Sequence, residues 1–242
     1  MVATSHAVLM DRTYRHQRWI YDATRAYYLL GRDRLIDGLQ PPPGGRVLEI
    51  ACGTGRNLMR VADRYPDRQL SGLDISEQML RSARSKLGPR AQLAQADACD
   101  FDAKALFGTA QFDRILLSYS LSMIPDWPRA LEVALDHLAP DGSLHLVDFG
   151  RQHRLPGWAR RGLNGWLARF HVKPRHGLQP LLTALARKRG LALQFEDLHA
   201  SYAQHAILGP MARNPQGPAA GDTGFASRHQ RPQPDTGASG PR

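Results

Sequence analysis

The chain has 242 residues, 42% of them hydrophobic, and its formal net charge at pH 7 is +10. A chain of this size and composition can bury one good-sized core, so we expect a single domain. The sequence holds no run of 18 uninterrupted apolar residues, and residues 1–10 lack a basic region followed by an apolar core. We therefore expect neither a transmembrane helix nor a secretion signal, and predict a cytoplasmic protein.

The positive charge is concentrated in one part of the chain. Residues 1–150 contain 18 Lys/Arg and 18 Asp/Glu, and residues 196–242 contain 4 of each kind. Residues 151–195, called the acid-free segment below, contain ten Lys/Arg and no Asp or Glu. A local basic block indicates an anionic partner, either a membrane surface or a nucleic acid.

Residues 7–39 have a helical pattern without internal proline and are rich in tyrosine and arginine. Amphipathic helices packed on the core explain most of these residues. A Pro/Gly-rich stretch at 41–45 then leads into the first predicted strand.

From residue 46 the pattern alternates between strand and helix. We predict strands at 46–50, 69–74, 91–96, 112–119 and 143–147, and helices at 57–65, 76–87 and 127–138. Pro140-Asp141-Gly142 is expected to separate the last helix from the last of these strands. Repeated strand–helix units indicate an α/β fold with a doubly wound, mostly parallel sheet.

Two closing strands at 191–198 and 202–208 complete the expected domain, residues 1–209. Its expected parts are a helical cap (1–44), a core (45–150), a basic amphipathic insertion (151–190) and the closing strands (191–209). Residues 210–242 hold 6 Pro, 5 Gly and almost no large apolar residues, so we expect a disordered tail. The two cysteines, Cys52 and Cys99, are expected to be free thiols.

The turn after the first strand is the most informative stretch of the core. Glu49 lies inside the end of the strand, and Gly53 and Gly55 follow in a turn that opens a helix near Asn57. A strand that turns sharply into a helix presents free backbone N–H groups to a ligand, and glycine allows that ligand to come close. The pattern predicts a nucleotide-type cofactor site.

Acids at the ends of later strands indicate which class of cofactor the site would bind. Asp74 lies about twenty residues beyond the glycine turn, where such folds hold a ribose diol, and Asp97 follows the third strand. A nicotinamide dinucleotide would require a third glycine in the turn, and its diphosphate would be repelled by Glu49. An acid at that position suits a cationic cofactor instead.

Four successive motifs resemble those of class I S-adenosylmethionine-dependent methyltransferases. They are Glu49-Ile50-Ala51-Cys52-Gly53-Thr54-Gly55, Leu73-Asp74-Ile75-Ser76-Glu77-Gln78-Met79-Leu80, Ala96-Asp97-Ala98 and Leu138-Ala139-Pro140-Asp141-Gly142-Ser143. The resemblance implies a Rossmann-like, seven-stranded sheet and S-adenosyl-L-methionine as cofactor. By this resemblance, the turn would contact the methionine part of the cofactor, and Asp74 would hold the ribose hydroxyls. Ile75 and Met79 would pack on the adenine ring, and Asp97 would accept from the adenine amino group. The implied cofactor residues are Glu49, Ala51, Gly53, Gly55, Asn57, Asp74, Ile75, Met79, Asp97, Ala98 and Ser118. Ala51 departs from the family, which usually has glycine there.

The stretch after the fourth strand bears on the methyl acceptor. It reads Ser118-Tyr119-Ser120-Leu121-Ser122-Met123, unlike the Asn/Asp-Pro-Pro-aromatic turn of enzymes that methylate nucleobase amines. This difference argues against base methylation and leaves other acceptors open.

The acid-free segment contains an amphipathic pattern. From Leu155 the apolar residues form a helical stripe that includes Trp158 and Trp166, and arginines lie outside the stripe. Such a helix suits a membrane interface. A helix packed on the sheet is the ordinary alternative, and a nucleic-acid surface fits the two tryptophans less well.

Two further stretches resemble the bacterial diacylglyceryl-homoserine N-methyltransferases of betaine-lipid synthesis. These are residues 14–18 with 21–36, and Trp166-Leu167-Ala168-Arg169-Phe170-His171-Val172-Lys173-Pro174-Arg175. The resemblance implies three successive methylations of a lipid-borne homoserine amine, with the lipid precursor made by a 3-amino-3-carboxypropyl transferase. It also implies an enzyme peripheral to the inner face of the cytoplasmic membrane, and we expect neither a metal nor a nucleic-acid partner.

Residue types in these stretches suit that chemistry, although helix packing explains most of them equally well. Aromatic faces recognise quaternary ammonium groups, an arginine fork binds a carboxylate, and a tyrosine or histidine can relay a proton. The candidate catalytic residues are Tyr14, Tyr21, Tyr119 and His171, with His16 as a second histidine. Tyr27 and Tyr28 are further cage candidates, and Arg15, Arg18, Arg32 and Arg175 are the headgroup candidates. Two alternatives stay open: a methyltransferase for a soluble small molecule, and a non-catalytic RNA-binding protein on the same fold.

Overall fold

The computed structural model describes residues 30–153, 156–168, 174–175 and 177–211. All of them belong to a compact unit that spans residues 1–211. The predicted helices before residue 30 and the predicted tail beyond residue 211 lie outside the described residues. Of the first predicted helical region, the structure describes α2 (Arg32–Leu39).

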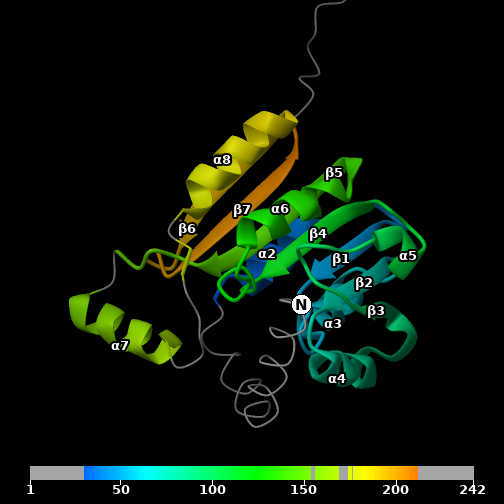
Figure 1. Cartoon of the computed structure of the whole chain (residues 1–242), viewed down its shortest axis with the longest axis horizontal. Helices are drawn as coiled ribbons and strands as arrows, with labels where there is room; N and C mark the ends of the chain where they lie inside the picture. The colour runs from blue at the N-terminus through cyan, green and yellow to red at the C-terminus, as the bar shows by residue number, and fades with distance from the viewer. Residues whose placement is uncertain (1–29, 154–155, 169–173, 176, 212–242) are drawn as a thin grey trace, which may run out of the picture. The chain divides into compact units, whose positions relative to one another are not determined.

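A seven-stranded sheet forms the centre of the described chain (Figure 1). Its strands are β1 (Arg46–Ile50), β2 (Gln69–Asp74), β3 (Ala91–Gln95), β4 (Phe112–Ser118), β5 (Leu138–Phe149), β6 (Leu191–Leu198) and β7 (Ala203–Pro210). The spatial order is β3-β2-β1-β4-β5-β7-β6, and only the pairings of β7 are antiparallel. The predicted doubly wound, mostly parallel sheet is confirmed.

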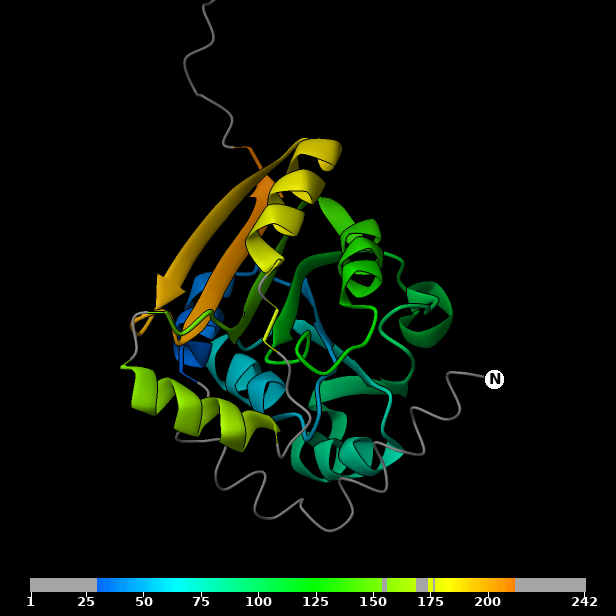
Figure 2. The same cartoon turned by 60° about the vertical axis from the view of Figure 1, so that its left-hand side comes forward.

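Helices cover both faces of the sheet (Figure 2). One hydrophobic cluster joins the sheet to α2, α3 (Arg56–Arg64) and α4 (Glu77–Leu87). The other joins it to α5 (Ala103–Phe107), α6 (Trp127–Asp136) and α8 (Leu178–Arg189). A further helix, α7 (Gly157–Ala168), contacts the first cluster through Leu163.

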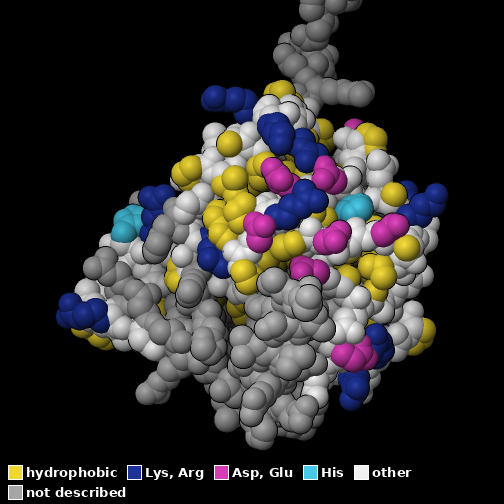
Figure 3. Space-filling model, viewed as in Figure 1, with side chains coloured by type: hydrophobic (Ala, Val, Ile, Leu, Met, Phe, Trp, Pro, Cys, Tyr) yellow, Lys and Arg dark blue, Asp and Glu magenta, His cyan; other side chains and the backbone are white. Residues whose placement is uncertain are grey.

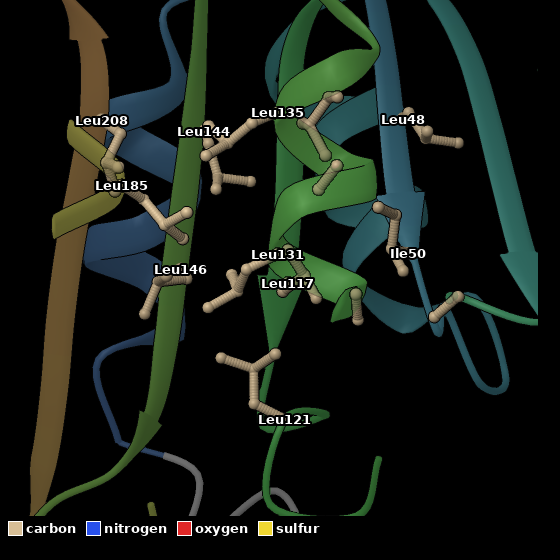
Figure 4. Packing of buried hydrophobic residues seen from close by; sticks show 14 of the residues in the cluster. Leu48, Ile50, Leu117, Leu121, Leu131, Leu135, Leu144, Leu146, Leu185 and Leu208 are labelled. Atoms are coloured by element: carbon tan, nitrogen blue, oxygen red, sulfur yellow. The ribbon is translucent and has the colours of Figure 1, made fainter. Parts of the chain in front are cut away.

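Leucines dominate the packing between α6, α8 and the sheet (Figure 4). Leu131 and Leu135 of α6 and Leu185 of α8 are buried in the same cluster as Leu146 of β5 and Leu208 of β7. Each buried leucine contributes about 1.5–3 kcal/mol relative to an exposed one. This packing holds α6 and α8 against the sheet. Because every strand except β7 runs in the same direction, the carboxyl ends of the other six strands lie at one edge.

Side-chain caps fix where two of the helices begin. The Ser76 hydroxyl accepts a bond from the Met79 N–H at 3.4 Å, as predicted for the start of α4. Asp126 caps α6 in the same way through the Arg129 N–H at 3.2 Å. Both caps lie next to the carboxyl edge of the sheet, so they also position the loops of that edge.

The structure corrects two of the predicted boundaries. Helix α6 ends at Asp136 rather than 138, and β5 begins at Leu138 rather than 143. Pro140-Asp141-Gly142 does not interrupt β5 because these residues lie in an irregularity of its pairing with β4, where the register steps from Leu138 to Ser143. The remaining predicted strands agree with the structure to within two residues, whereas α5 and α8 are helices that we did not predict.

Candidate functional site

The predicted site residues gather at the carboxyl edge of the sheet. Strand β1 lies between β2 and β4, and all three run parallel. The turn after β1, Asp74 at the end of β2 and Ser118 at the end of β4 therefore come to the same edge. Ligands bind at this edge in doubly wound folds.

Three residues of the turn after β1 adopt left-handed backbone angles. Their φ values are 56° at Ala51, 56° at Gly53 and 73° at Gly55. The turn is closed by the Gly55 N–H, which donates to the Cys52 carbonyl at 3.0 Å. At Ala51 this conformation costs on the order of 1 kcal/mol because of its Cβ atom. Ala51 thus occupies a glycine conformation at the position where the sequence departs from the family.

The two glycines of the turn have different surroundings. At Gly53, no atom of the described chain lies within 4 Å of the position that a Cβ would take. At Gly55, a Cβ would lie 2.7 Å from Leu87 Cδ1 and 3.0 Å from Ala83 Cβ of α4. Gly55 therefore allows α4 to pack closely against the turn, whereas Gly53 leaves space that a ligand can fill.

Asp74 connects the turn to α4. Its Oδ2 accepts from the Gly53 N–H at 2.8 Å, and its Oδ1 accepts from the Ser76 N–H at 2.9 Å. Each carboxylate oxygen can accept a further hydrogen bond. Asp74 can therefore accept both hydroxyls of a diol while it holds the turn in place.

Glu49 is buried below the turn, with 2% of its surface exposed. Its Oε1 accepts from Asn57 Nδ2 at 2.7 Å, whereas its Oε2 has no hydrogen-bond partner among the described residues. Burial raises the pKa of Glu49 to about 8, against the opposing effects of Asn57 and the charge of Arg32. The sequence predicts at this position an acid that suits a cationic cofactor. A pKa of about 8 favours the protonated form of Glu49 at neutral pH, and an approaching cation would favour its ionisation.

The residues predicted to surround an adenine ring follow β2 and β3. Ile75 is half-buried and Met79 is buried at the start of α4. Asp97 accepts from the Cys99 N–H at 2.9 Å, and Ala98 beside it is buried. Gln95 Nε2 donates to the Ile75 carbonyl at 2.9 Å, which joins the two loops.

Tyr119 lies at the edge but points into the core. Its φ is 55°, its ring packs against Phe149 with centroids 4.7 Å apart, and its hydroxyl donates to the Leu30 carbonyl at 2.5 Å. Burial raises the pKa of the Tyr119 hydroxyl well above its usual value. In this arrangement the side chain connects Leu30, two residues before α2, to the sheet. Ser118, by contrast, has a buried hydroxyl without a hydrogen-bond partner in the described chain.

Most other acceptor candidates lie outside the described residues. These are Tyr14, Arg15, His16, Arg18, Tyr21, Tyr27, Tyr28 and His171. Of the two remaining arginines, Arg32 is buried near Glu49. Arg175 donates to two backbone carbonyls, those of Leu121 and Ile124.

Sequence reasoning missed Asp148, at the end of β5. It is 1% exposed, and it accepts from the Ser122 N–H at 3.2 Å and from the Phe149 N–H at 2.7 Å. Burial raises the pKa of Asp148 to about 6. An acid that ends a buried parallel strand, as Asp74 does, was the signal that could have revealed it.

The acid-free segment has both paired and exposed charges. Lys188 lies 3.8 Å from Glu132, and Arg189 lies 2.7 Å from Asp136, both across α8 and α6. Figure 3 shows acidic and basic side chains interleaved on this face. On α7, Trp158 is 75% exposed and Arg161 is also exposed. Within the described ranges, we find no helix with the length and hydropathy needed to span a bilayer.

Comparisons with known proteins relate this chain to methyltransferases. Residues 47–142 match the family model of the methyltransferase domain. The nocamycin O-methyltransferase of Saccharothrix syringae is 30% identical over 58% of this chain and 51% of its own length. The trans-aconitate 2-methyltransferase of Deinococcus radiodurans is 29% identical over 60% of this chain and 55% of its own length. The chain thus spans about half the length of these curated relatives.

Solved structures show the same fold at low sequence identity. Haemonchus contortus phosphoethanolamine N-methyltransferase 2, in complex with S-adenosyl-L-methionine, gives a TM-score of 0.67 at 16% identity, covering 85% of this chain and 60% of that one. The plantazolicin methyltransferase BpumL, in complex with a pentazolic desmethylPZN analog and SAH, gives a TM-score of 0.63 at 17% identity. The match covers 86% of this chain and 96% of that one.

Residues 47–142 therefore resemble a methyltransferase domain, and the described chain has the fold of these solved class I methyltransferases. The cofactor of this class is S-adenosylmethionine, and the observed edge suits it. Gly53 leaves open space, Asp74 can accept a diol, and Glu49 offers an unpartnered buried oxygen to a cation within the described chain.

Proposed function

We propose that this protein is an S-adenosylmethionine-dependent N-methyltransferase that acts on the amine of a membrane-lipid headgroup. The acceptor that we infer is diacylglyceryl-homoserine, methylated three times to the trimethylated betaine lipid. The observation that carries the lipid assignment is α7, which lies in the acid-free segment and exposes Trp158 beside a methyltransferase core. The resemblance of residues 14–18, 21–36 and 166–175 to the betaine-lipid enzymes supports the same acceptor.

Different described residues would bind different parts of the cofactor. Asp74, oriented by the Gly53 N–H, would accept the ribose hydroxyls of the cofactor. Ionised Glu49 would stabilise the positively charged end of the cofactor. When bound, the cofactor supplies a methyl group on a sulfonium centre, which a neutral amine displaces in line. Asp148 and the buried serines after β4 lie on the side where an acceptor would approach.

The acid-free segment would bring the enzyme to its substrate. An exposed tryptophan inserts favourably into a membrane interface, and each basic residue near an anionic leaflet contributes on the order of 1 kcal/mol. Lys188 and Arg189 are paired with acids of α6, so α7 is the stronger contact surface among the described residues of this segment. The proposed location is the inner face of the cytoplasmic membrane, with a 3-amino-3-carboxypropyl transferase supplying the lipid precursor.

A second candidate function is methylation of a soluble small molecule. The names of the curated relatives favour it, because they include a nocamycin O-methyltransferase and a trans-aconitate 2-methyltransferase. In that case α7 would cover the acceptor pocket rather than contact lipid.

One assay separates these functions. The full chain is incubated with methyl-labelled S-adenosylmethionine and either diacylglyceryl-homoserine in anionic vesicles or soluble homoserine. We expect label in mono-, di- and trimethylated lipid, and we expect Asp74→Ala to weaken cofactor binding by about tenfold or more. Label in soluble acceptors alone would favour the second function. Salt-dependent RNA binding without any methyl transfer would favour the RNA-binding alternative.

A further inference from the structure

The loop between β4 and α6, residues 119–126, borders the proposed reaction site. Because β1 and β4 are parallel neighbours, this loop and the turn Ala51–Gly55 follow the ends of adjacent strands. The loop therefore forms the wall beside the methyl donor from which an acceptor approaches. We call it the acceptor loop.

Asp148 fixes the acceptor loop from the side of the sheet. Its Oδ2 accepts from the Ser122 N–H at 3.2 Å. Within the loop, the Met123 and Ile124 N–H groups both donate to the Ser120 carbonyl, at 2.9 and 3.2 Å. The loop is thus a tight turn with one attachment to a buried carboxyl group.

Arg175 fixes the same loop from the acid-free segment. Its Nε donates to the Leu121 carbonyl at 2.9 Å, and its Nη2 donates to the Ile124 carbonyl at 2.7 Å. The guanidinium carbon lies 5.9 Å from the centroid of the Trp127 ring at the start of α6. The charge of Asp148 also attracts Arg175. These two donors span the turn as a planar fork, which a lysine cannot reproduce.

We propose that Arg175 is a positioning residue that sets the shape of the acceptor loop for the methyl acceptor. It connects the acid-free segment directly to the wall of the site. The inference rests on the proposed function for the identity of the acceptor. The loop itself can be tested without any acceptor.

The test compares Arg175→Met and Arg175→Lys with the matched control Arg187→Met. Arg187 is an exposed arginine of the same segment, on α8, so its variant removes the same charge without touching the loop. Hydrogen–deuterium exchange of the Ser122, Met123 and Ile124 amides reports on loop order. Calorimetry with S-adenosylhomocysteine reports on the cofactor site, and the lipid assay gives KM and kcat for the acceptor.

We expect Arg175→Met to speed exchange of these amides about tenfold or more and to lower acceptor kcat/KM by ~10–100-fold, as misplacement of a reacting group does. The Kd for S-adenosylhomocysteine should stay within about threefold of wild type, and Arg175→Lys should restore part of the activity. Arg187→Met should resemble wild type in exchange and cofactor affinity. A general loss of folding would instead speed exchange throughout the chain and weaken the cofactor.

Unchanged exchange at Ser122–Ile124 in Arg175→Met would overturn the inference. Equal effects of Arg175→Met and Arg187→Met on acceptor kinetics would also overturn it. If wild type binds S-adenosylhomocysteine but methylates no lipid, the proposed function fails, and the exchange data still decide the role of Arg175.

Discussion

At the scale of single residues, Glu49 would determine how the proposed cofactor site responds to the charge of its ligand. Its carboxyl group is buried, has one oxygen without a partner among the described residues, and has a pKa raised to about 8 by burial. A sulfonium cation stabilises the ionised form, whereas a neutral thioether does not. The proposed site would therefore distinguish the methyl donor from its product by charge.

This leads to a prediction for cofactor affinity. S-adenosylmethionine should bind more tightly as the pH rises from 6.5 to 8, by up to about tenfold per unit, because Glu49 must lose its proton on binding. S-adenosylhomocysteine should show a much weaker dependence. Calorimetry on wild type and Glu49→Gln tests this, and the substitution should remove the pH dependence and weaken the donor more than the product. Equal losses for both ligands would contradict the prediction.

The two glycines of the turn give a matched pair for a second prediction. Gly55→Ala should lower the free energy of unfolding by about 2–4 kcal/mol, because its Cβ would overlap Leu87 and Ala83 at a left-handed φ. Gly53→Ala should lower it by only about 1–2 kcal/mol, because the strain acts without a clash.

Cofactor affinity should show the opposite order. The Gly53→Ala methyl group would occupy the open space, so we expect a larger loss of S-adenosylhomocysteine affinity in Gly53→Ala than in Gly55→Ala. Denaturant titration and calorimetry on both variants check the two orders. If the same variant showed the larger loss both of stability and of S-adenosylhomocysteine affinity, the two glycines would not have the separate roles proposed here.

At the scale of elements, the strands were predictable, whereas the helices α5 and α8 were not. Apolar runs such as Ile115-Leu116-Leu117 identify buried strands because both sheet faces are covered. Helix α8 was not predicted because the acid-free segment was considered mainly for its positive charge. Leu178, Leu182 and Leu185 nevertheless have the spacing of a helix. The irregularity at residues 139–142 depends on pairing with β4, which a single sequence does not reveal.

Helix α7 carries the third prediction. Trp158→Ala should reduce binding to anionic vesicles by about tenfold, because a large side chain no longer leaves water for the interface. Met211→Ala is the matched control, because Met211 is 64% exposed but lies outside the acid-free segment. Vesicle flotation measures both variants. A loss as large in Met211→Ala would mean that α7 has no special part in the contact.

At the scale of the whole molecule, buried ionisable groups link stability to pH. His145 is 3% exposed, and burial lowers its pKa to about 3. Its contribution is complete above its unfolded pKa of about 6.5 and is lost as the pH falls. Glu49 and Asp148 act in the opposite direction, because their raised pKa values favour the folded state at low pH.

The fourth prediction uses the pH window in which Glu49 has the largest effect of these three groups. Between pH 6.5 and 8 the contributions of His145 and Asp148 change much less than that of Glu49, because unfolding releases the proton that folded Glu49 retains. The melting temperature of the ligand-free protein should therefore fall as the pH rises through this window. Glu49→Gln should flatten this fall, as measured by calorimetry in buffers of constant ionic strength.

The charge distribution shows what the sequence could not establish about the whole molecule. The count of ten basic residues without an acid is correct, but it treats the segment as isolated. In the fold, Glu132 and Asp136 of α6 neutralise part of α8, and Arg175 is used inside the protein. Pairing between segments distant in sequence decides which charges face a partner.

The two cysteines at the carboxyl edge have a practical consequence for labelling. Burial raises the pKa of the Cys52 thiol well above its usual value and that of the Cys99 thiol to about 12. Both thiols are therefore protonated at neutral pH and react slowly with maleimides. A cysteine introduced at exposed Gly162 of α7, where a Cβ meets open space within the described chain, would react selectively. A fluorescent dye at that position would report contact with a vesicle without the removal of either native cysteine.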